Sequence, residues 1–251
     1  MLSVVDHGRF TYTVNLEKVF RYRSREVIEG IDMDIKAVIF DLDGTLVDSL
    51  EDIANACNEV LESEGLPVHS IKSYRGMIGH GIRHLIQEAL PDSRSNRVDE
   101  ILELYEAHYE ENLLIKSKPY GGMVKILESL AAQGLPMSVL SNKPHDMTTH
   151  IVKELFGKIP FRKVVGQRRG KPQKPDPQVA VEIARAMDVA PERCAIVGDT
   201  PVDILTARNA NMQAVAITWG FRSNDELAEL EPDKLIHAPY ALLSHFDNKT
   251  D

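Results

Sequence analysis

Two aspartates separated by one residue, Asp41 and Asp43, directly follow an apolar run at residues 35–40. A short apolar run that ends near a glycine, here Gly44, is typical of a buried strand. Open α/β sheets bind their ligands at the carboxyl ends of such strands. Carboxylates at that place are costly to leave uncompensated, and a hard divalent cation such as Mg²⁺ suits oxygen ligands. The alternative is a surface turn in which Asp-Gly merely ends the strand.

Three later groups of polar residues follow predicted strands or lie in loops beside them. They are Ser141-Asn142-Lys143, Lys174-Pro175-Asp176-Pro177 and Gly198-Asp199-Thr200-Pro201-Val202-Asp203. Because parallel strands end at one edge of a sheet, these groups can converge with the first aspartate pair. Together they supply four carboxylates, a hydroxyl and an ammonium group. This combination suits a phosphoryl group held beside a divalent cation.

The elements that must position these residues alternate between strand and helix. Apolar runs predict strands over residues 35–40, 136–140, 163–165, 194–198 and 214–217. Helical periodicity marks the segments between them, and residues 49–118 carry only helical patterns. We therefore predict an α/β fold, a doubly wound, mostly parallel, Rossmann-like sheet with an inserted all-helical cap. The expected catalytic core comprises residues 35–48 and 119–251, and the expected cap comprises residues 49–118.

The four polar groups, in this order, resemble those of the haloacid dehalogenase superfamily of phosphotransferases. The resemblance runs from Ile35 to about Phe246, and it is strongest to the phosphoglycolate phosphatase-like branch. The segments that support the branch are Asp41–Thr45 with Asp48-Ser49, Gly79-His80-Gly81, Ser141-Asn142-Lys143-Pro144, Lys174–Pro177 and Gly198–Asp203.

The resemblance implies that Asp41 is the nucleophile and forms an aspartyl-phosphate. It implies that Asp43 first protonates the leaving oxygen and then activates water, while its backbone carbonyl ligates Mg²⁺. Dehalogenases of this superfamily do not need the second acid, so Asp43 favours phosphoryl chemistry. It does not separate a phosphatase from a phosphomutase.

The remaining motif residues are assigned by the resemblance to the phosphoryl group or to the metal. The phosphoryl group would be bound by Ser141, Asn142 and Lys174. The Mg²⁺ would be held by Asp41, Asp43 and Asp199, with Thr45, Gly198 and Asp203 in supporting positions. Lys171 competes with Lys174 for the phosphate, but the Lys-Pro-Asp-Pro run at Lys174 matches the family pattern more fully.

Gly79, His80, Gly81 and Arg83 are the candidates within the cap for substrate selection. The guanidinium of Arg83 suits a substrate carboxylate, although an exposed helix arginine fits the pattern equally well. His80 lies four residues before His84, but no acidic or cysteine partner nearby completes a zinc site. Trp219 and Phe221, which follow the last strong strand, are interpreted as packing residues.

Bulk composition excludes several classes of function. The formal charge is −9 and there is no long basic run, which argues against nucleic-acid binding. No apolar stretch approaches the ~20 residues that cross a bilayer, and no signal peptide is recognisable. The only cysteines, Cys57 and Cys194, are expected to be buried thiols in a reducing cytoplasm.

Residues 1–34 fit poorly with the rest of the chain. Alternation around Tyr12 and Val14 predicts a strand or hairpin of weak stability. We expect this N-terminal extension to be dispensable or poorly ordered, with functional translation beginning at Met33.

The sequence thus predicts a cytoplasmic, Mg²⁺-dependent phosphatase that acts on a small phosphorylated metabolite through an aspartyl-phosphate. The resemblance makes 2-phosphoglycolate the leading candidate. The alternatives are a sugar-phosphate phosphomutase and a non-catalytic, phosphate-binding regulatory module. The oligomeric state is left open.

Overall fold

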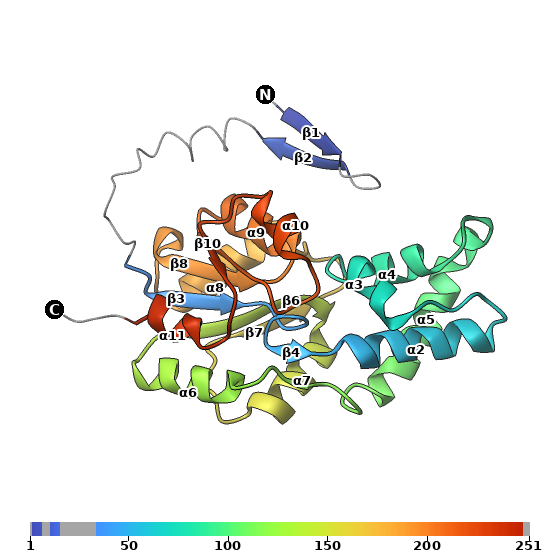
Figure 1. The fold of residues 1–251 in the computed structure, drawn as a ribbon, viewed down its shortest axis with the longest axis horizontal. Coiled ribbons are helices and arrows are strands. Elements are labelled where there is room, and N and C mark those ends of the chain that lie inside the picture. Colours follow the sequence, from blue (N-terminus) through green and yellow to red (C-terminus); the bar gives the residue numbers. More distant parts are fainter. Residues whose placement is uncertain (1, 7–10, 16–33, 248–251) are drawn as a thin grey trace. The chain divides into compact units, whose positions relative to one another are not determined.

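This computed structural model describes residues 2–6, 11–15 and 34–247, and the chain divides into two compact units, residues 1–34 and 35–251. In the first unit, β1 (Leu2–Asp6) pairs antiparallel with β2 (Thr11–Asn15), as the alternating pattern there predicted (Figure 1). The expectation that this extension is poorly ordered concerns mainly residues that lie outside the described ones.

The second unit is built on a parallel sheet of six strands in the order β10-β9-β8-β3-β6-β7. Its strands are β3 (Ala37–Phe40), β6 (Met137–Pro144), β7 (Val164–Gln167), β8 (Cys194–Gly198), β9 (Gln213–Ile217) and β10 (Lys234–Ile236). This is the strand order of doubly wound dinucleotide-binding folds, which place ligands where the order reverses. Here that point lies between the adjacent strands β3 and β8. The predicted fold class is confirmed.

Helices cover both sides of this sheet. They are α6 (Met123–Ala132), α7 (His145–Phe156), α8 (Gln178–Ala186), α9 (Pro201–Asn209), α10 (Asn224–Ala228) and α11 (Ala241–His245). In Figure 1, α6 and α7 lie below the sheet and α9 lies above it. Ala37 and Ile39, on one side of β3, are buried in a cluster with Ile183 of α8 and Ile204 of α9. This burial on both faces explains why the central strands are almost entirely apolar.

Four helices between β3 and α6 form a separate layer beside the sheet (Figure 1). They are α2 (Leu50–Ser63), α3 (Tyr74–Met77), α4 (Ile82–Ala89) and α5 (Val98–Glu111), with 3₁₀ turns at Ile71–Ser73 and Asp92–Arg97. Both α2 and α4 pack against α5, and the three helices bury apolar side chains that include Ile53, Leu85 and Ile101. In the described part of the chain, no helix combines the length and apolar character required to cross a bilayer.

The chain enters and leaves this helical layer at neighbouring points. Strand β4 (Val47–Asp48) pairs antiparallel with β5 (Lys118–Pro119), on either side of the layer in sequence. The buried Asp52 reinforces the connection, because its carboxylate accepts hydrogen bonds from the backbone N–H groups of Lys116 and Ser117. The two points at which the chain crosses between the helical layer and the rest of the unit therefore lie side by side.

Candidate active site

The carboxyl ends of the central strands bring together the polar groups found in the sequence. Asp41 follows β3 directly, and Asp199 follows the adjacent β8. Ser141 and Asn142 lie in the last part of β6, on the other side of β3, while Lys174 comes from the loop before α8. All five side chains are buried, in keeping with a site enclosed between the sheet and the helical layer.

Lys174 is the cation at the centre of the site. Its Nζ lies 2.7 Å from Asp41 Oδ1 and 2.6 Å from Asp203 Oδ1. Burial alone would lower the pKa of Lys174, but the Asp203 and Asp41 carboxylates raise it above its ordinary value. The ammonium therefore stays charged. Lys171, its competitor in the sequence, is exposed.

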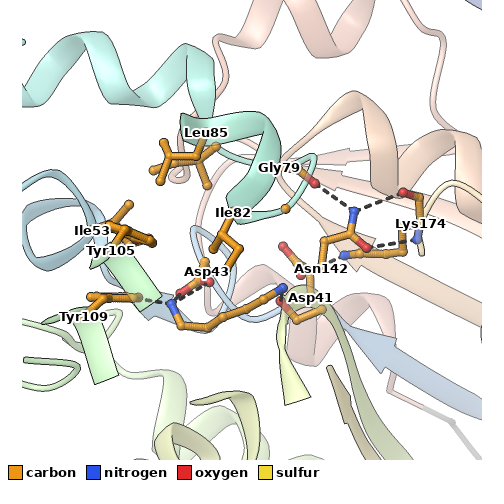
Figure 2. Close-up of a pocket in the computed structure, with 14 residues that line it drawn as sticks. Asp41, Asp43, Ile53, Gly79, Ile82, Leu85, Tyr105, Tyr109, Asn142 and Lys174 are labelled. Atoms are coloured by element: carbon orange, nitrogen blue, oxygen red, sulfur yellow. Dashed lines mark hydrogen bonds and ion pairs between the residues drawn. The ribbon is translucent and has the colours of Figure 1, made fainter. Parts of the chain in front are cut away.

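Asn142 fixes the loop that carries Lys174. Its Oδ1 accepts from Lys174 N at 2.9 Å, and its Nδ2 donates to Lys174 O at 3.0 Å and to Gly79 O at 3.0 Å (Figure 2). Both amide protons of Asn142 are thus used within the protein. The nearby Ser141 Oγ accepts a hydrogen bond from Lys143 N at 3.3 Å and lines the pocket beside Asp41.

Asp199 is held by close main-chain packing. Its Oδ1 accepts from Thr45 Oγ1 at 3.0 Å, and its Oδ2 accepts from Phe221 N at 2.8 Å. A Cβ on Gly44 or Gly220 would lie 2.3 Å from an Asp199 atom, so only glycine allows this approach. Phe221, interpreted from the sequence as a packing residue, is indeed buried, and its backbone also positions this carboxylate.

Asp203 lies in the first turn of helix α9 and links that helix to the site. Its Oδ2 accepts from the N–H of Thr200 at 3.1 Å, which is one half of a helix capping box, and also from the Thr200 hydroxyl at 2.7 Å. This leaves Oδ1 for Lys174. A Cβ on Gly198 would lie 2.1 Å from Asp203 Cγ, which explains the glycine at this position.

The carboxylates of Asp41, Asp199 and Asp203 form a compact oxygen cluster. One oxygen from each lies within 4.8 Å of the others. Burial raises the pKa of Asp41 well above its usual range, against the lowering effect of Lys174. Burial and then the charge of Asp203 raise the pKa of Asp199 to about 7. Ionised carboxylates this close repel one another, and an all-oxygen donor set fits a hard divalent cation that would offset the repulsion.

Asp43 lies apart from this cluster and has other partners. Ser49 Oγ donates to Asp43 Oδ1 at 2.6 Å, and Lys143 Nζ lies 3.1 and 3.0 Å from its two carboxylate oxygens. Lys143 Nζ also contacts Tyr109 Oη of helix α5 at 2.7 Å. Lys143 lies in one of the sequence motifs, which predicts no separate role for it, and no sequence pattern indicates Tyr109.

A pocket lies between the sheet edge and the helical layer (Figure 2). Its polar floor consists of Asp41, Asp43, Ser141, Asn142, Lys143 and Lys174. The helical layer supplies a mainly apolar wall of Ile53, Ile78, Ile82, Leu85, Tyr105 and Tyr109, with Gly79 and Gly81 between them. A ligand in this pocket would meet charge on one side and hydrocarbon on the other.

Two of the four cap candidates line the pocket and two do not. Gly79 and Gly81 are among the described residues that line it, whereas His80 and Arg83 are not. Arg83 is exposed and pairs with the Asp99 carboxylate. Burial, with the neighbouring His84, lowers the pKa of His80 to about 4, so its imidazole is neutral near pH 7.

Two arginines that the sequence did not single out tie the helical layer to the core. Arg222 Nη2 donates to the carbonyls of Gly76 and Ile78, at 3.0 and 2.8 Å. Conversely, Arg75 of the helical layer donates from Nη1 to Gly220 O of the core at 3.2 Å. These contacts hold the segment before Gly79 against the loop that positions Asp199.

Comparison with known proteins agrees with this geometry. Residues 38–217 match the family described as haloacid dehalogenase-like hydrolase. A phosphoglycolate phosphatase of Aquifex aeolicus is 31% identical over 215 residues, which cover 85% of this chain and 98% of that protein. Phosphoglycolate phosphatase 1 of Pseudomonas aeruginosa is 31% identical over 207 residues, or 80% of this chain and 76% of that protein. The structure of a haloacid dehalogenase-like family hydrolase from Streptococcus pneumoniae superimposes with a TM-score of 0.77 at 29% identity, covering 85% of this chain and 99% of that one.

Proposed function

Because the chain belongs to the haloacid dehalogenase-like hydrolase family, we propose that it is a Mg²⁺-dependent phosphatase of small phosphate monoesters. The observation that carries the proposal is the Asp41 carboxylate, which lines the pocket with the Lys174 ammonium 2.7 Å away. A carboxylate would repel a phosphate dianion, and an adjacent buried cation offsets that repulsion. The names of the relatives make 2-phosphoglycolate the leading candidate substrate.

In the proposed reaction, a carboxylate oxygen of Asp41 attacks the phosphorus and the ester oxygen leaves. Asp43, also in the pocket, gives its proton to that oxygen, so an alcohol departs and an aspartyl-phosphate remains. Asp43 then takes a proton from a water molecule, which attacks the phosphorus. Inorganic phosphate is released, and the Asp41 carboxylate and the protonated Asp43 are restored.

The other site residues bind and orient in this scheme. Lys174 and Ser141 would bind the phosphoryl oxygens. Asn142 would act on that group through the Lys174 main chain, to which its amide is bonded. The Mg²⁺ would be held by Asp41, Asp199 and the backbone carbonyl of Asp43, with Asp203 as a further ligand or a supporting residue. When bound, the metal neutralises charge on the phosphoryl group.

We assign residues 49–118 the role of a cap over residues 35–48 and 119–251. The apolar wall that this cap contributes to the pocket would exclude water from the phosphoryl group. We also place the reaction in the cytoplasm. The support for that location is that Cys57 and Cys194 are buried free thiols, as expected of a protein from a reducing compartment.

The test is phosphate release from a panel of small phosphate esters, with and without Mg²⁺. Wild type should release phosphate only with the metal, and Asp41→Asn should abolish the release. If wild type releases no phosphate from any ester, the proposal fails. Isomer analysis of the same mixtures would then separate a phosphomutase from a module that only binds phosphate esters.

A further inference from the structure

Lys143 is a buried cation that the reaction scheme above leaves without a role. It lies near the end of β6, and only 5% of its surface is exposed. Its ammonium has three N–H donors, and it makes three hydrogen bonds, two to the carboxylate of Asp43 and one to Tyr109 Oη (Figure 2). The ammonium is therefore fully used within the protein, although it lines the pocket.

These contacts fix the carboxylate of Asp43 from two sides. Ser49 Oγ donates to Oδ1 at 2.6 Å, and Lys143 Nζ lies 3.1 Å from the same oxygen and 3.0 Å from the other. A carboxylate that contacts one ammonium through both oxygens is restrained in rotation as well as in position. Such restraint matters for a group that must reach the ester oxygen in one step and a water molecule in the next.

The third contact of Lys143 comes from the other side of the pocket. Tyr109 belongs to α5 of the cap, and its ring centroid lies 4.6 Å from Lys143 Nζ. The same ring stacks on the ring of Tyr105, with 5.3 Å between the two centroids. Tyr109 is fully buried, so its position is set by the packing of the cap. The Lys143–Tyr109 contact can form only while the cap lies against the core.

We propose that Lys143 is a positioning residue for Asp43, and that Tyr109 makes this positioning depend on cap closure. The proposal rests on the function proposed above, in which Asp43 transfers the protons. The cap then does more than cover the substrate, because its closure also positions the Asp43 carboxyl that transfers the protons. Opening of the cap withdraws Tyr109 and loosens Lys143, so Asp43 is held in place mainly while the cap is closed.

The choice of leaving group separates positioning of Asp43 from a merely structural role. p-Nitrophenolate leaves without a proton, whereas an alkoxide needs one. In Lys143→Met we expect turnover of an alkyl phosphate to fall roughly 100-fold, the scale of lost acid–base catalysis. With p-nitrophenyl phosphate, the same variant should show a rapid burst of p-nitrophenolate equal to the enzyme concentration, because this first step needs no proton. Slow turnover should follow, because hydrolysis of the aspartyl-phosphate still depends on Asp43. Lys143→Arg should recover part of the loss.

A double variant distinguishes positioning from direct contact with the substrate. If Lys143 acts through Asp43, adding Lys143→Met to Asp43→Asn should not slow turnover further. If the two losses multiply instead, Lys143 contacts the substrate itself and the proposal is overturned. The proposal would also be overturned if Lys143→Met lost the p-nitrophenolate burst and slowed the turnover of both esters by the same factor. Lys153→Met, on the exposed side of α7, is the matched control and should behave as wild type.

Tyr109→Phe keeps the test decisive if Lys143→Met fails to fold. It removes only the hydroxyl and retains the stacked ring, and we expect about a tenfold loss with the alkyl ester. Tyr109→Phe should also show a rapid burst of p-nitrophenolate with p-nitrophenyl phosphate. Unchanged turnover of the alkyl ester would overturn the role of the cap. Failure of the proposed function would look different, because wild type itself would then release no phosphate.

Discussion

The side-chain amide of Asn142 is hydrogen-bonded to both main-chain polar groups of Lys174, at 2.9 Å to its N–H and at 3.0 Å to its carbonyl. A residue at the end of a strand thereby sets the position of a lysine that lies in a loop 32 residues later. The same amide reaches Gly79 O, so the strand, the loop and the cap meet at one side chain.

Asn142→Ala should therefore impair both stability and activity. It leaves buried main-chain groups of Lys174 without partners, and we expect the free energy of unfolding to fall by about 2–3 kcal/mol. Urea denaturation and steady-state kinetics are the measurements. Asn209→Ala is the matched control, because it removes an exposed hydrogen bond to Pro175 O of the same loop. Equal effects of the two variants would contradict this account of Asn142.

Lys174 and Lys171 should differ sharply when each is changed to methionine. Lys174→Met leaves Asp41 and Asp203 without their buried cation, which should cost about 3–5 kcal/mol of unfolding free energy in metal-free protein. It should also lower kcat roughly 10²–10³-fold. Lys171 is exposed, and its loss should change neither quantity. Comparable losses of phosphate release in the two variants would show that the loop lysines have been assigned wrongly.

The raised pKa of Asp199, about 7, makes the stability of the metal-free protein depend on pH. Between the ordinary value of 3.8 and about 7, the folded state binds more protons at this carboxyl than the unfolded state. The free energy of unfolding should therefore fall as pH rises through this window, with the full contribution present below it and lost above it. Denaturation with a chelator present, across this range, measures the slope.

Divalent cations compete with those protons, so the affinity for Mg²⁺ should increase over the same pH window. Asp199→Asn serves as the reference protein for both measurements, since it cannot ionise. A variant with the same slope as wild type would assign the titration to another group.

Gly220→Ala should disturb the metal cluster without changing any ligand. The added Cβ would lie 2.3 Å from Asp199 Cβ, so this carboxylate must shift. We expect the apparent Kd for Mg²⁺ to rise roughly 10–100-fold, the usual effect of disturbing the support of a ligand. Gly121→Ala is the control, because no atom lies within 4 Å of the new methyl group. Calorimetric titration of both variants with Mg²⁺ checks the prediction, and wild-type affinity in Gly220→Ala would refute it.

Removal of residues 1–32 should leave the melting temperature and the phosphatase activity unchanged. The sheet, the cap and every site residue named above belong to residues 35–251, which form one compact unit. Thermal melts of the full chain and of a chain that starts at Met33 make the comparison. A large loss in either property would show that the extension contributes to the folded enzyme.

Much of the core fold was predictable because central parallel strands are apolar on both faces. Strands β3, β8 and β9 are buried throughout, and each was recognised from its continuous apolar run. Strand β10 was not predicted, because three residues at the edge of the sheet, only one of them buried, carry no usable pattern. The pair β4–β5 is shorter still and includes Pro119, which sequence rules exclude from most strands.

Site residues whose positions follow from the order of the strands could be predicted from the sequence. Contacts that depend on how the helices pack over the sheet could not. Asp41 and Asp199 follow adjacent parallel strands, so their convergence was expected from the chain order alone. The contact of Lys143 with Tyr109 depends on how α5 lies over the sheet, which no local pattern reports. Arg83 does not reach the pocket for a similar reason, because the face of α4 that is buried carries Leu85, Ile86 and Ala89.

The pairing of β4 with β5 has a consequence for how such enzymes diversify. Paired strands lie about 5 Å apart, a gap that a turn of a few residues can close. In topological terms the four-helix layer is thus an elaborated hairpin loop, and its replacement by a longer, shorter or unrelated segment leaves the order of the central strands untouched. The strands that carry Asp41, Ser141 and Asp199 thus lie outside the inserted stretch of the chain, so selection can rewrite much of the insert while conserving the sheet.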